Sequence, residues 1–216
     1  MFLSRKSQLV PAADTLAGRP ERTFAIAERH RVLDAPVVTD EIPEGFEVAL
    51  FGLGCFWGAE EIYWQVPGVW STSVGYAGGD TPNPTYEEVC SGLTNHTEAV
   101  RVVFDPTQVS YADLVKIFFE VHDPTQGFRQ GNDVGTQYRS AIYWTTPAQE
   151  QVARELTKVY GEELTRRRLG DITTEIRPAS ETPYYYAEDQ HQQYLAKNPF
   201  GYRCHANTGV KFPATA

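Results

Sequence analysis

The stretch FEVALFGLGCFWGAEE, residues 46–61, joins a run of strand-forming residues to the start of a helix. Residues 46–53 are apolar and rich in strand formers, which predicts a buried strand. Gly52 and Gly54 allow a sharp turn, and apolar residues at helical spacing predict a helix over residues 57–66. The cysteine of this stretch is therefore placed where a buried strand turns into a helix.

That position suits a nucleophile. Unpaired N–H groups and the positive end of the dipole at a helix N-terminus favour thiolate, so we expect the pKa of Cys55 to lie below the value of roughly 8.5 for a free thiol. The alternative is a small buried apolar residue. Glycines on both sides and the large aromatic neighbours Phe56 and Trp57 favour the nucleophile.

Strands and helices alternate after this stretch. Further strands are expected over residues 69–76, 98–104, 140–144 and 171–177. Further helices are expected over residues 85–91, 110–121, 147–168 and 184–196. The helix at 110 is the clearest, because Ser110 and Asp113 form a start like a capping box. This order predicts an α+β fold, a two-layer sandwich with helices on one face of a mostly antiparallel sheet.

Length and composition set further limits. A chain of 216 residues with 41% hydrophobic content can bury one good core. We expect a single domain over residues 43–216, whose irregular tail, residues 197–216, is mobile. Residues 1–42 lack a sustained apolar period and are expected to form an extension packed on the domain surface.

The net charge of −9 argues against a nucleic-acid or acidic-membrane partner, because both select clustered Lys and Arg. The basic run Arg166-Arg167-Arg168 is expected to complement a helix C-terminus. The N-terminus lacks the apolar run of a signal peptide, and no segment approaches transmembrane length. Three cysteines are too few for a disulfide scaffold, so a reducing cytoplasm is expected.

The segment Gly54-Cys55-Phe56-Trp57-Gly58 resembles the signature of the A-type peptide methionine sulfoxide reductases. Six further blocks resemble that family in its order: residues 75–79, 82–92, 96–100, 122–124, 131–140 and 185–195. The resemblance implies a ferredoxin-like core with a long irregular C-terminal segment. It also implies reduction of methionine S-sulfoxide, free or in proteins, as a repair of oxidised proteins. We expect a monomer that needs no metal or other cofactor.

The resemblance further assigns catalytic roles to Glu98, Tyr86 and Tyr138. Sulfoxide reduction needs hydrogen-bond donors for the oxygen and a proton source, and a protonated carboxyl among tyrosine hydroxyls supplies both. Glu98 begins an apolar strand, where burial would raise its pKa and keep it protonated. The alternative for Glu98 is a solvated charge at the end of a strand.

Substrate contacts are expected from three residues. Phe56 and Trp57 can enclose the thioether methyl group, because aromatic faces make favourable contacts with it, although in isolation they would be core residues. The resemblance assigns Asp133 to the substrate pocket through hydrogen bonds or a bound water. The alternative for Asp133 is closure of a turn through its own backbone.

Attack by Cys55 on the sulfoxide would release methionine and leave a sulfenic acid, with which a second thiol must condense. Cys204 lies in a polar, Gly- and Pro-rich segment and is the expected resolving cysteine. Cys90 is the competitor, and it is expected to be a packed, inert thiol. Some members of the family carry a further cysteine where this chain has Lys211 and Phe212. A single Cys55–Cys204 disulfide, reduced by thioredoxin or a similar dithiol protein, is therefore expected.

Two other classes of function also use cysteine and histidine. A cysteine hydrolase would need a histidine base, for which this chain offers His30, His96, His122, His191 and His205, none within a known hydrolase signature. A structural metal site would need spaced ligands, whereas Cys204 and His205 are adjacent and no Cys-x-x-Cys occurs.

Overall fold

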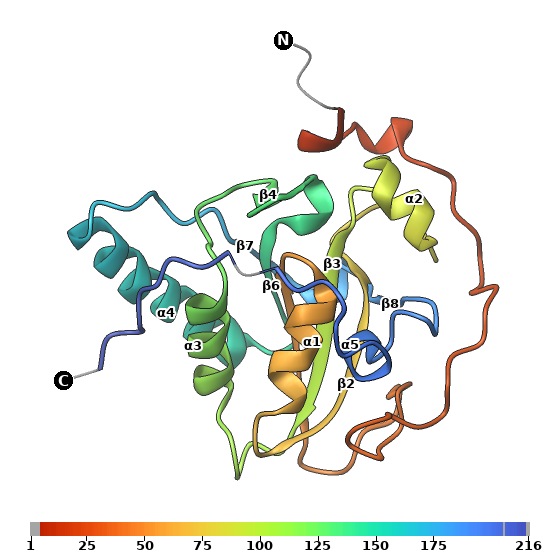
Figure 1. Cartoon of the computed structure of the whole chain (residues 1–216), viewed down its shortest axis with the longest axis horizontal. Helices are drawn as coiled ribbons and strands as arrows, with labels where there is room; N and C mark the ends of the chain where they lie inside the picture. The colour runs from red at the N-terminus through yellow and green to blue at the C-terminus, as the bar shows by residue number, and fades with distance from the viewer. Residues whose placement is uncertain (1–4, 205, 215–216) are drawn as a thin grey trace.

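The computed structural model describes residues 5–204 and 206–214, which form a mixed α and β fold around one large sheet (Figure 1). The strands of this sheet are β1 (Glu47–Leu53), β2 (Val69–Ala77), β3 (Thr97–Phe104), β6 (Ser140–Trp144), β7 (Glu175–Pro178) and β8 (Tyr185–Tyr186). A separate pair consists of β4 (Arg129–Gln130) and β5 (Asp133–Val134). The helices are α1 (Phe56–Trp64), α2 (Tyr86–Ser91), α3 (Tyr111–Val121), α4 (Pro147–Arg166) and α5 (Tyr194–Lys197).

The six strands are ordered β7-β6-β1-β3-β2-β8. All neighbours are antiparallel except β6 and β7, which are parallel. The prediction of a mostly antiparallel sheet is confirmed. The sequence predicts a strand over residues 171–177. The observed strand β7 is shorter, because only Glu175–Pro178 pairs with β6.

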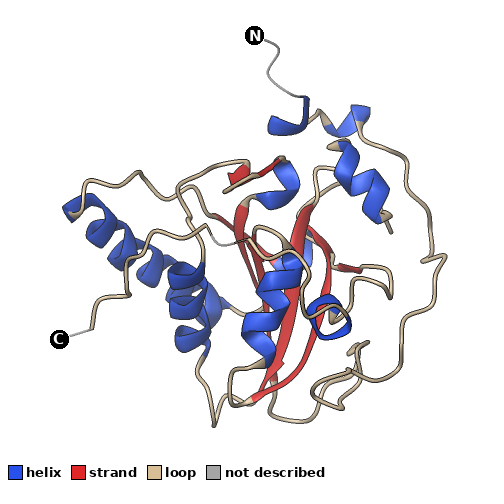
Figure 2. Ribbon diagram, in the orientation of Figure 1, coloured by secondary structure: helices blue, strands red, loops and turns tan. Residues whose placement is uncertain are grey.

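Helices α1, α3 and α4 cover one face of the sheet (Figure 2). The alternation along β1 explains why: Ala49, Phe51 and Leu53 point into the core beneath these helices, while Leu50 belongs to a smaller cluster on the other face. The ring of Phe51 stacks on Tyr63 of α1 at 5.3 Å between centroids. Burial of these large side chains fixes α1 against the sheet.

Hydroxyl side chains cap the starts of three of the described helices, α2, α3 and, through Thr146, α4. Thr85 and Glu88 form a capping box at the start of α2, and the Ser110 hydroxyl accepts from Asp113 N at the predicted start of α3. Helix α4 ends two residues before its predicted limit of 168. Arg168 adopts a left-handed conformation, φ 60°, which ends the helix.

The prediction of a helix over residues 184–196 is wrong. The segment contains the short strand β8, then turns, and only α5, Tyr194–Lys197, is helical. Tertiary hydrogen bonds compete with the helix. The Gln192 side chain accepts from Val74 N at 2.9 Å and donates to Val74 O at 2.8 Å, and Gln193 is left-handed at φ 46°.

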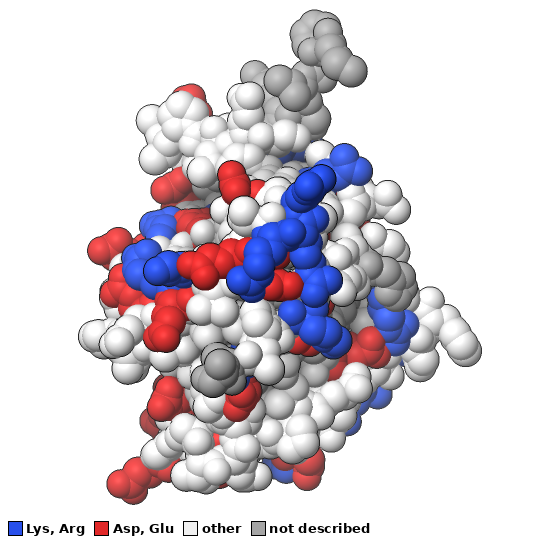
Figure 3. Space-filling view, turned by 90° about the vertical axis from the view of Figure 1, so that its left-hand side faces the viewer, with Lys and Arg blue, Asp and Glu red and all other residues white. Residues whose placement is uncertain are grey.

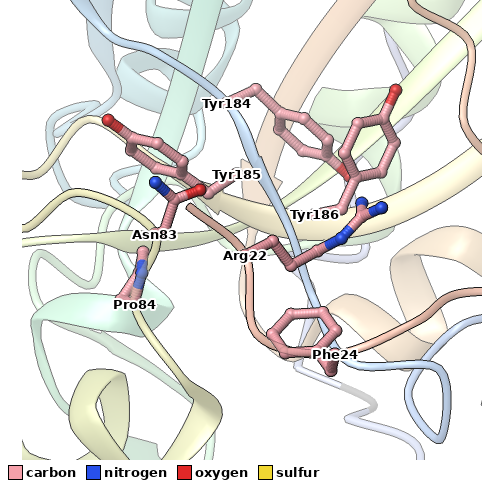
Figure 4. A pocket seen from close by; sticks show the side chains of 7 residues that line it. All are labelled: Arg22, Phe24, Asn83, Pro84, Tyr184, Tyr185 and Tyr186. Atoms are coloured by element: carbon pink, nitrogen blue, oxygen red, sulfur yellow. The ribbon is translucent and has the colours of Figure 1, made fainter. Parts of the chain in front are cut away.

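The N-terminal extension runs down one side of the molecule, from the neighbourhood of α2 to the far end of the sheet (Figure 1). The His30 side chain is buried, with Nε2 2.8 Å from Thr72 Oγ1 of β2. Arg101 of β3 donates to the Thr39 carbonyl at 2.9 Å. A small hollow lies between the extension and β8 (Figure 4). Its lining consists of Arg22, Phe24, Asn83, Pro84, Tyr184, Tyr185 and Tyr186.

Acidic and basic side chains lie beside one another on the face that exposes the end of α4 (Figure 3). Glu163 pairs with both Arg166 and Arg167 there, so the basic run at this helix end is engaged within its own helix. Within the described ranges, no helix has the length and apolar character needed to cross a membrane.

Candidate active site

The candidate site lies at one end of the strands of the sheet, beyond the end of β1 and the beginnings of β3 and β6. Because β1 is antiparallel to β3 and β6, the end of β1 adjoins the beginnings of both neighbours. Cys55 follows β1, Glu98 is the second residue of β3, and Tyr138 ends the turn before β6. Tyr86 begins α2, which follows the end of β2 at the same end of the sheet. The topology thus collects residues that are far apart in sequence.

Cys55 is the N-cap residue of α1, as the sequence predicts, and it is a free, buried thiol. The turn before it depends on Gly54, which has φ 96°, a conformation that favours glycine. A Cβ at this position would also lie 2.7 Å from the Gln130 side chain. Glycine at position 54 therefore allows both the turn and the close approach of the β4–β5 hairpin.

Glu98 is buried, with 1% of its surface exposed. Its Oε2 accepts a hydrogen bond from Phe56 N at 3.0 Å. The pKa of Glu98 is raised to about 8, mainly by burial; the Phe56 N–H opposes this rise and the charge of Asp133 adds to it. The expectation of a buried, protonated carboxyl is confirmed, and the solvated strand-end alternative is wrong.

The expected lowering of the Cys55 pKa is wrong. Burial and the charge of Glu98 raise it well above its ordinary value, while the N–H groups of Trp57 and Gly58 act in the predicted direction but are outweighed. A helix N-terminus contributes partial charges, whereas desolvation penalises the whole thiolate charge. At neutral pH the site therefore holds a thiol beside a carboxylic acid.

Tyr86 and Tyr138 approach the same carboxyl. Burial and the charge of Glu98 raise the pKa of both phenols above the usual range, so both are neutral donors. The Tyr86 backbone N donates to Glu188 Oε1 at 2.8 Å, and the same carboxylate accepts from the Tyr76 hydroxyl at 2.9 Å. Glu188 therefore holds the start of α2 in place beside the sheet.

Aromatic rings form a wall next to Cys55. The Trp57 ring stacks on Tyr194 at 3.9 Å between centroids, and its Nε1 donates to His191 Nδ1 at 3.2 Å. His191 also packs on Tyr86 at 4.3 Å. Phe56 lies beside these rings, 5.6 Å from His191. Sequence reasoning assigned His191 and Tyr194 no place in this wall, although both lie in the block 185–195 that carries the family resemblance.

Asp133 and Cys204 lie together at the β4–β5 hairpin. Asp133 Oδ2 accepts from the Tyr202 hydroxyl at 3.1 Å, and burial raises the Asp133 pKa. Cys204 is half-buried, and its thiol donates to the Gln130 carbonyl at 3.5 Å. The Gln130 side chain packs against Gly54, so the residue that holds Cys204 also touches the turn before Cys55.

Cys90 is not remote from the site. It lies in α2, half-buried, and its thiol shares a hydrogen bond with the Tyr86 hydroxyl. Burial raises the pKa of Cys90. The predicted packing of this thiol is confirmed only in part, because Cys90 is half-buried. Its contact with Tyr86 was missed, although residues four apart in a helix lie on the same face.

None of the four histidines that the structure describes is hydrogen-bonded to Cys55 as a hydrolase base would be. Burial lowers the pKa of His30, His96 and His122 to about 4, and each ring bonds elsewhere, His122 Nε2 to Ser140 Oγ at 2.8 Å. His191 Nδ1 is taken by Trp57. His205 lies outside the described residues. In the described part of the chain, no group of three His, Cys, Asp or Glu side chains could hold a metal ion.

The fold and this site define a thiol-dependent enzyme in which a buried cysteine is paired with a buried acid. Residues 47–215 match the family model described as peptide methionine sulfoxide reductase. The chain therefore belongs to the peptide methionine sulfoxide reductase family.

Similar proteins agree with this membership. Peptide methionine sulfoxide reductase MsrA of Streptomyces griseus is 56% identical over 214 residues, which cover 99% of this chain and 96% of that protein. MsrA of Salinispora arenicola is 55% identical over 216 residues, with 99% and 96% covered. The solved structure of methionine sulfoxide reductase A of Corynebacterium diphtheriae has 52% identity and a TM-score of 0.85, covering 96% of this chain and 100% of that one.

Proposed function

We propose that this chain reduces methionine S-sulfoxide, free or within proteins, to methionine and so repairs oxidised proteins. The observation that carries the proposal is the buried Glu98 carboxyl bonded to Phe56 N, one residue after Cys55. Family membership and the names of relatives that are more than half identical support the same reaction. The S configuration is inferred from the A-type family alone.

In the first step the sulfur of Cys55 attacks the sulfoxide sulfur, and Glu98 donates a proton to the oxygen. The new bond between the two sulfur atoms and the S–O bond of the substrate then break, and the hydroxyl passes to the sulfur of Cys55. Methionine leaves with its sulfur reduced by two electrons, and Cys55 is oxidised by two electrons to a sulfenic acid. The proton lost by the thiol replaces the one lost by Glu98. Since Cys55 and Glu98 both hold protons before substrate binds, the thiol must deprotonate in the complex rather than in the free enzyme.

Two parts of the site bind the sulfoxide, one its oxygen and the other its methyl group. The hydroxyls of Tyr86 and Tyr138 are neutral donors close enough to Glu98 to feel its charge, and they can bond the sulfoxide oxygen there. For Tyr86 this requires its hydroxyl to turn from Cys90 to the substrate. Phe56 and Trp57 can enclose the methyl group, and the stack with Tyr194 keeps the Trp57 ring in place. Asp133, whose pKa is raised by burial, can contact the substrate through hydrogen bonds or a bound water.

In the second step the thiol of Cys204 attacks the Cys55 sulfenic acid, forms the Cys55–Cys204 disulfide and releases water. Thioredoxin or a similar dithiol protein then reduces the disulfide, and no cofactor is required. The contact of Cys204 with Gln130, which also packs against Gly54, supports Cys204 as the resolving residue.

Several broader assignments accompany this function. The strand order β6-β1-β3-β2, with α1 and α3 on one face, supports a ferredoxin-like core. The contact of His30 with Thr72 and the hydrogen bond from Arg101 to the Thr39 carbonyl support residues 1–42 as an extension packed on a single domain, residues 43–216, which includes the tail 197–216. We assign the chain to a monomer in a reducing cytoplasm, where the disulfide is transient.

The test is a single turnover. Reduced protein is incubated with methionine sulfoxide in the absence of any reductant, and the methionine released and the intact mass are measured. One equivalent of methionine and a loss of two hydrogen atoms are expected. Cys55→Ser should release none while keeping its fold. Absence of methionine would contradict the assignment. An acyl adduct after a parallel incubation with a thioester substrate would also contradict it.

A further inference from the structure

Arg203, which directly precedes Cys204, is bound to the catalytic helix. Its Nε donates to Glu61 Oε2 at 2.6 Å and its Nη2 to Glu61 Oε1 at 2.7 Å, a two-pronged pair with α1. Nη1 donates to the carbonyls of Pro199 at 2.9 Å and Gly201 at 3.3 Å. The Arg203 guanidinium therefore links α1 to the tail and also stabilises the turn at residues 199–201 that precedes it.

The pair is protected in part from solvent. The side chains of Arg203 and Glu61 are 29% and 23% exposed. A planar guanidinium that meets both oxygens of a carboxylate fixes direction as well as distance, which a single contact does not. This geometry separates the pair from the exposed, loosely held ion pairs that contribute little.

The β4–β5 hairpin holds the tail on its other side through two hydrogen bonds. The Tyr202 hydroxyl donates to Asp133 Oδ2, and the Cys204 thiol donates to the Gln130 carbonyl. Residues 202–204 thus bridge the hairpin and α1, and Cys55 caps the N-terminus of that same helix. Three consecutive residues carry these tethers. The side chain of Arg203 reaches Glu61, so the arginine itself has no part in bond making.

We propose that the Arg203–Glu61 ion pair is a positioning device for the resolving cysteine, which sets the rate of disulfide formation without affecting reduction of the sulfoxide. This inference rests on the proposed function. With the pair intact, Cys204 is kept at high effective concentration near Cys55. Without it, the chain around Cys204 samples more conformations, and fewer of them allow attack on the sulfenic acid.

The experiment measures the two chemical steps separately in a single turnover of the full chain. Methionine release reports the first step, and trapping with a dimedone-type reagent at successive times reports the lifetime of the sulfenic acid. Arg203→Gln and Glu61→Gln should each release methionine at the wild-type rate. Each should lengthen the sulfenic acid lifetime about fivefold, the size expected for a well-aligned surface pair.

Charge reversal and a matched control sharpen the result. Arg203→Glu should slow resolution more than Arg203→Gln, and combining it with Glu61→Arg should recover part of the rate. Arg154→Gln removes an ion pair with Glu150 within α4 that does not involve residues 202–204, and should leave both steps unchanged. High salt should lengthen the lifetime in the wild type and hardly at all in Arg203→Gln.

The results that overturn the proposal differ from those that overturn the function. A wild-type sulfenic acid lifetime in both Gln variants, or an equal slowing of both steps, would refute the positioning role alone. No methionine release from the wild type would refute the proposed reaction. A Cys55–Cys90 disulfide as the main product would refute the choice of Cys204, and the positioning role with it.

Discussion

The backbone N–H of Phe56 donates to Glu98 Oε2 at 3.0 Å, so a carboxyl from β3 caps the first turn of the helix that begins after Cys55. This single bond joins the proposed nucleophile and acid through one residue of backbone. It leaves the carboxyl proton free for a bond to the substrate oxygen. The predictions below depend on this arrangement and on the groups that surround it.

Glu98→Gln should lower the rate of sulfenic acid formation by roughly 10²–10⁴, because an amide keeps a hydrogen-bond donor but has no proton to give. Rapid-quench measurement of methionine release isolates this step. Glu188→Gln is the matched control, since Glu188 holds the backbone of Tyr86 without facing the thiol and should reduce the rate far less. A wild-type rate in Glu98→Gln would remove Glu98 from the chemistry.

Cys204→Ser should consume one equivalent of methionine sulfoxide and then stall with a trappable sulfenic acid, because Cys55 and its pocket are unchanged. Cys90→Ser should sustain turnover with thioredoxin, since a serine hydroxyl can still accept from Tyr86. Steady-state turnover with thioredoxin and peptide mapping of the oxidised protein decide the matter. Sustained turnover by Cys204→Ser would show that another group resolves the sulfenic acid.

Trp57→Phe should raise KM about fivefold with a smaller change in kcat. The ring and most of its apolar area remain, but the hydrogen bond to His191 is lost, and one neutral hydrogen bond contributes about 1 kcal/mol. Steady-state kinetics with a peptide methionine sulfoxide measures both constants. Trp144→Phe serves as control, because Trp144 Nε1 has no hydrogen-bond partner. A loss confined to kcat would assign Trp57 to the chemical step instead.

The free energy of unfolding should be greatest near pH 6.5. Burial holds the pKa of Glu60 at about 7 and of Glu98 at about 8, against 4.5 for an ordinary glutamate. The stability that these two groups contribute is full below pH 4.5, declines as pH rises above it, and is lost once pH has passed the folded values. Burial lowers the pKa of His30, His96 and His122 from 6.5 to about 4. The stability that these histidines contribute is therefore lost as pH falls from about 6.5.

Below about pH 6.5 the three histidines outweigh the two glutamates, and above it the glutamates alone titrate. Urea unfolding at about pH 5, 6.5 and 8 measures the profile. In Glu60→Gln the decline above pH 6.5 should be shallower, because one of the two groups is gone. A profile that rises steadily to pH 8 would show that these carboxyls are not protonated in the folded protein.

Local sequence determined the elements that carry the site. The strand and helix around Cys55, the capped start of α3 and the alternation of Val100, Val102 and Phe104 follow from periodicity and caps that act within a few residues. Glu98 could be anticipated as a buried acid for the same reason, since an apolar strand carries it inward. The seven motif blocks identified the family before any contact was known.

Tertiary structure decided what depends on groups distant in sequence. Residues 184–196 have a helical pattern, yet the buried Glu60 carboxylate takes two hydrogen bonds from Gln193, at 2.7 and 2.8 Å, and the helix gives way. The same holds for the raised pKa of Cys55, set by burial and by Glu98, and for the pair of Arg203 with Glu61. Sequence patterns report forces within a few residues, whereas desolvation and partner choice arise only when the folded chain brings distant groups together.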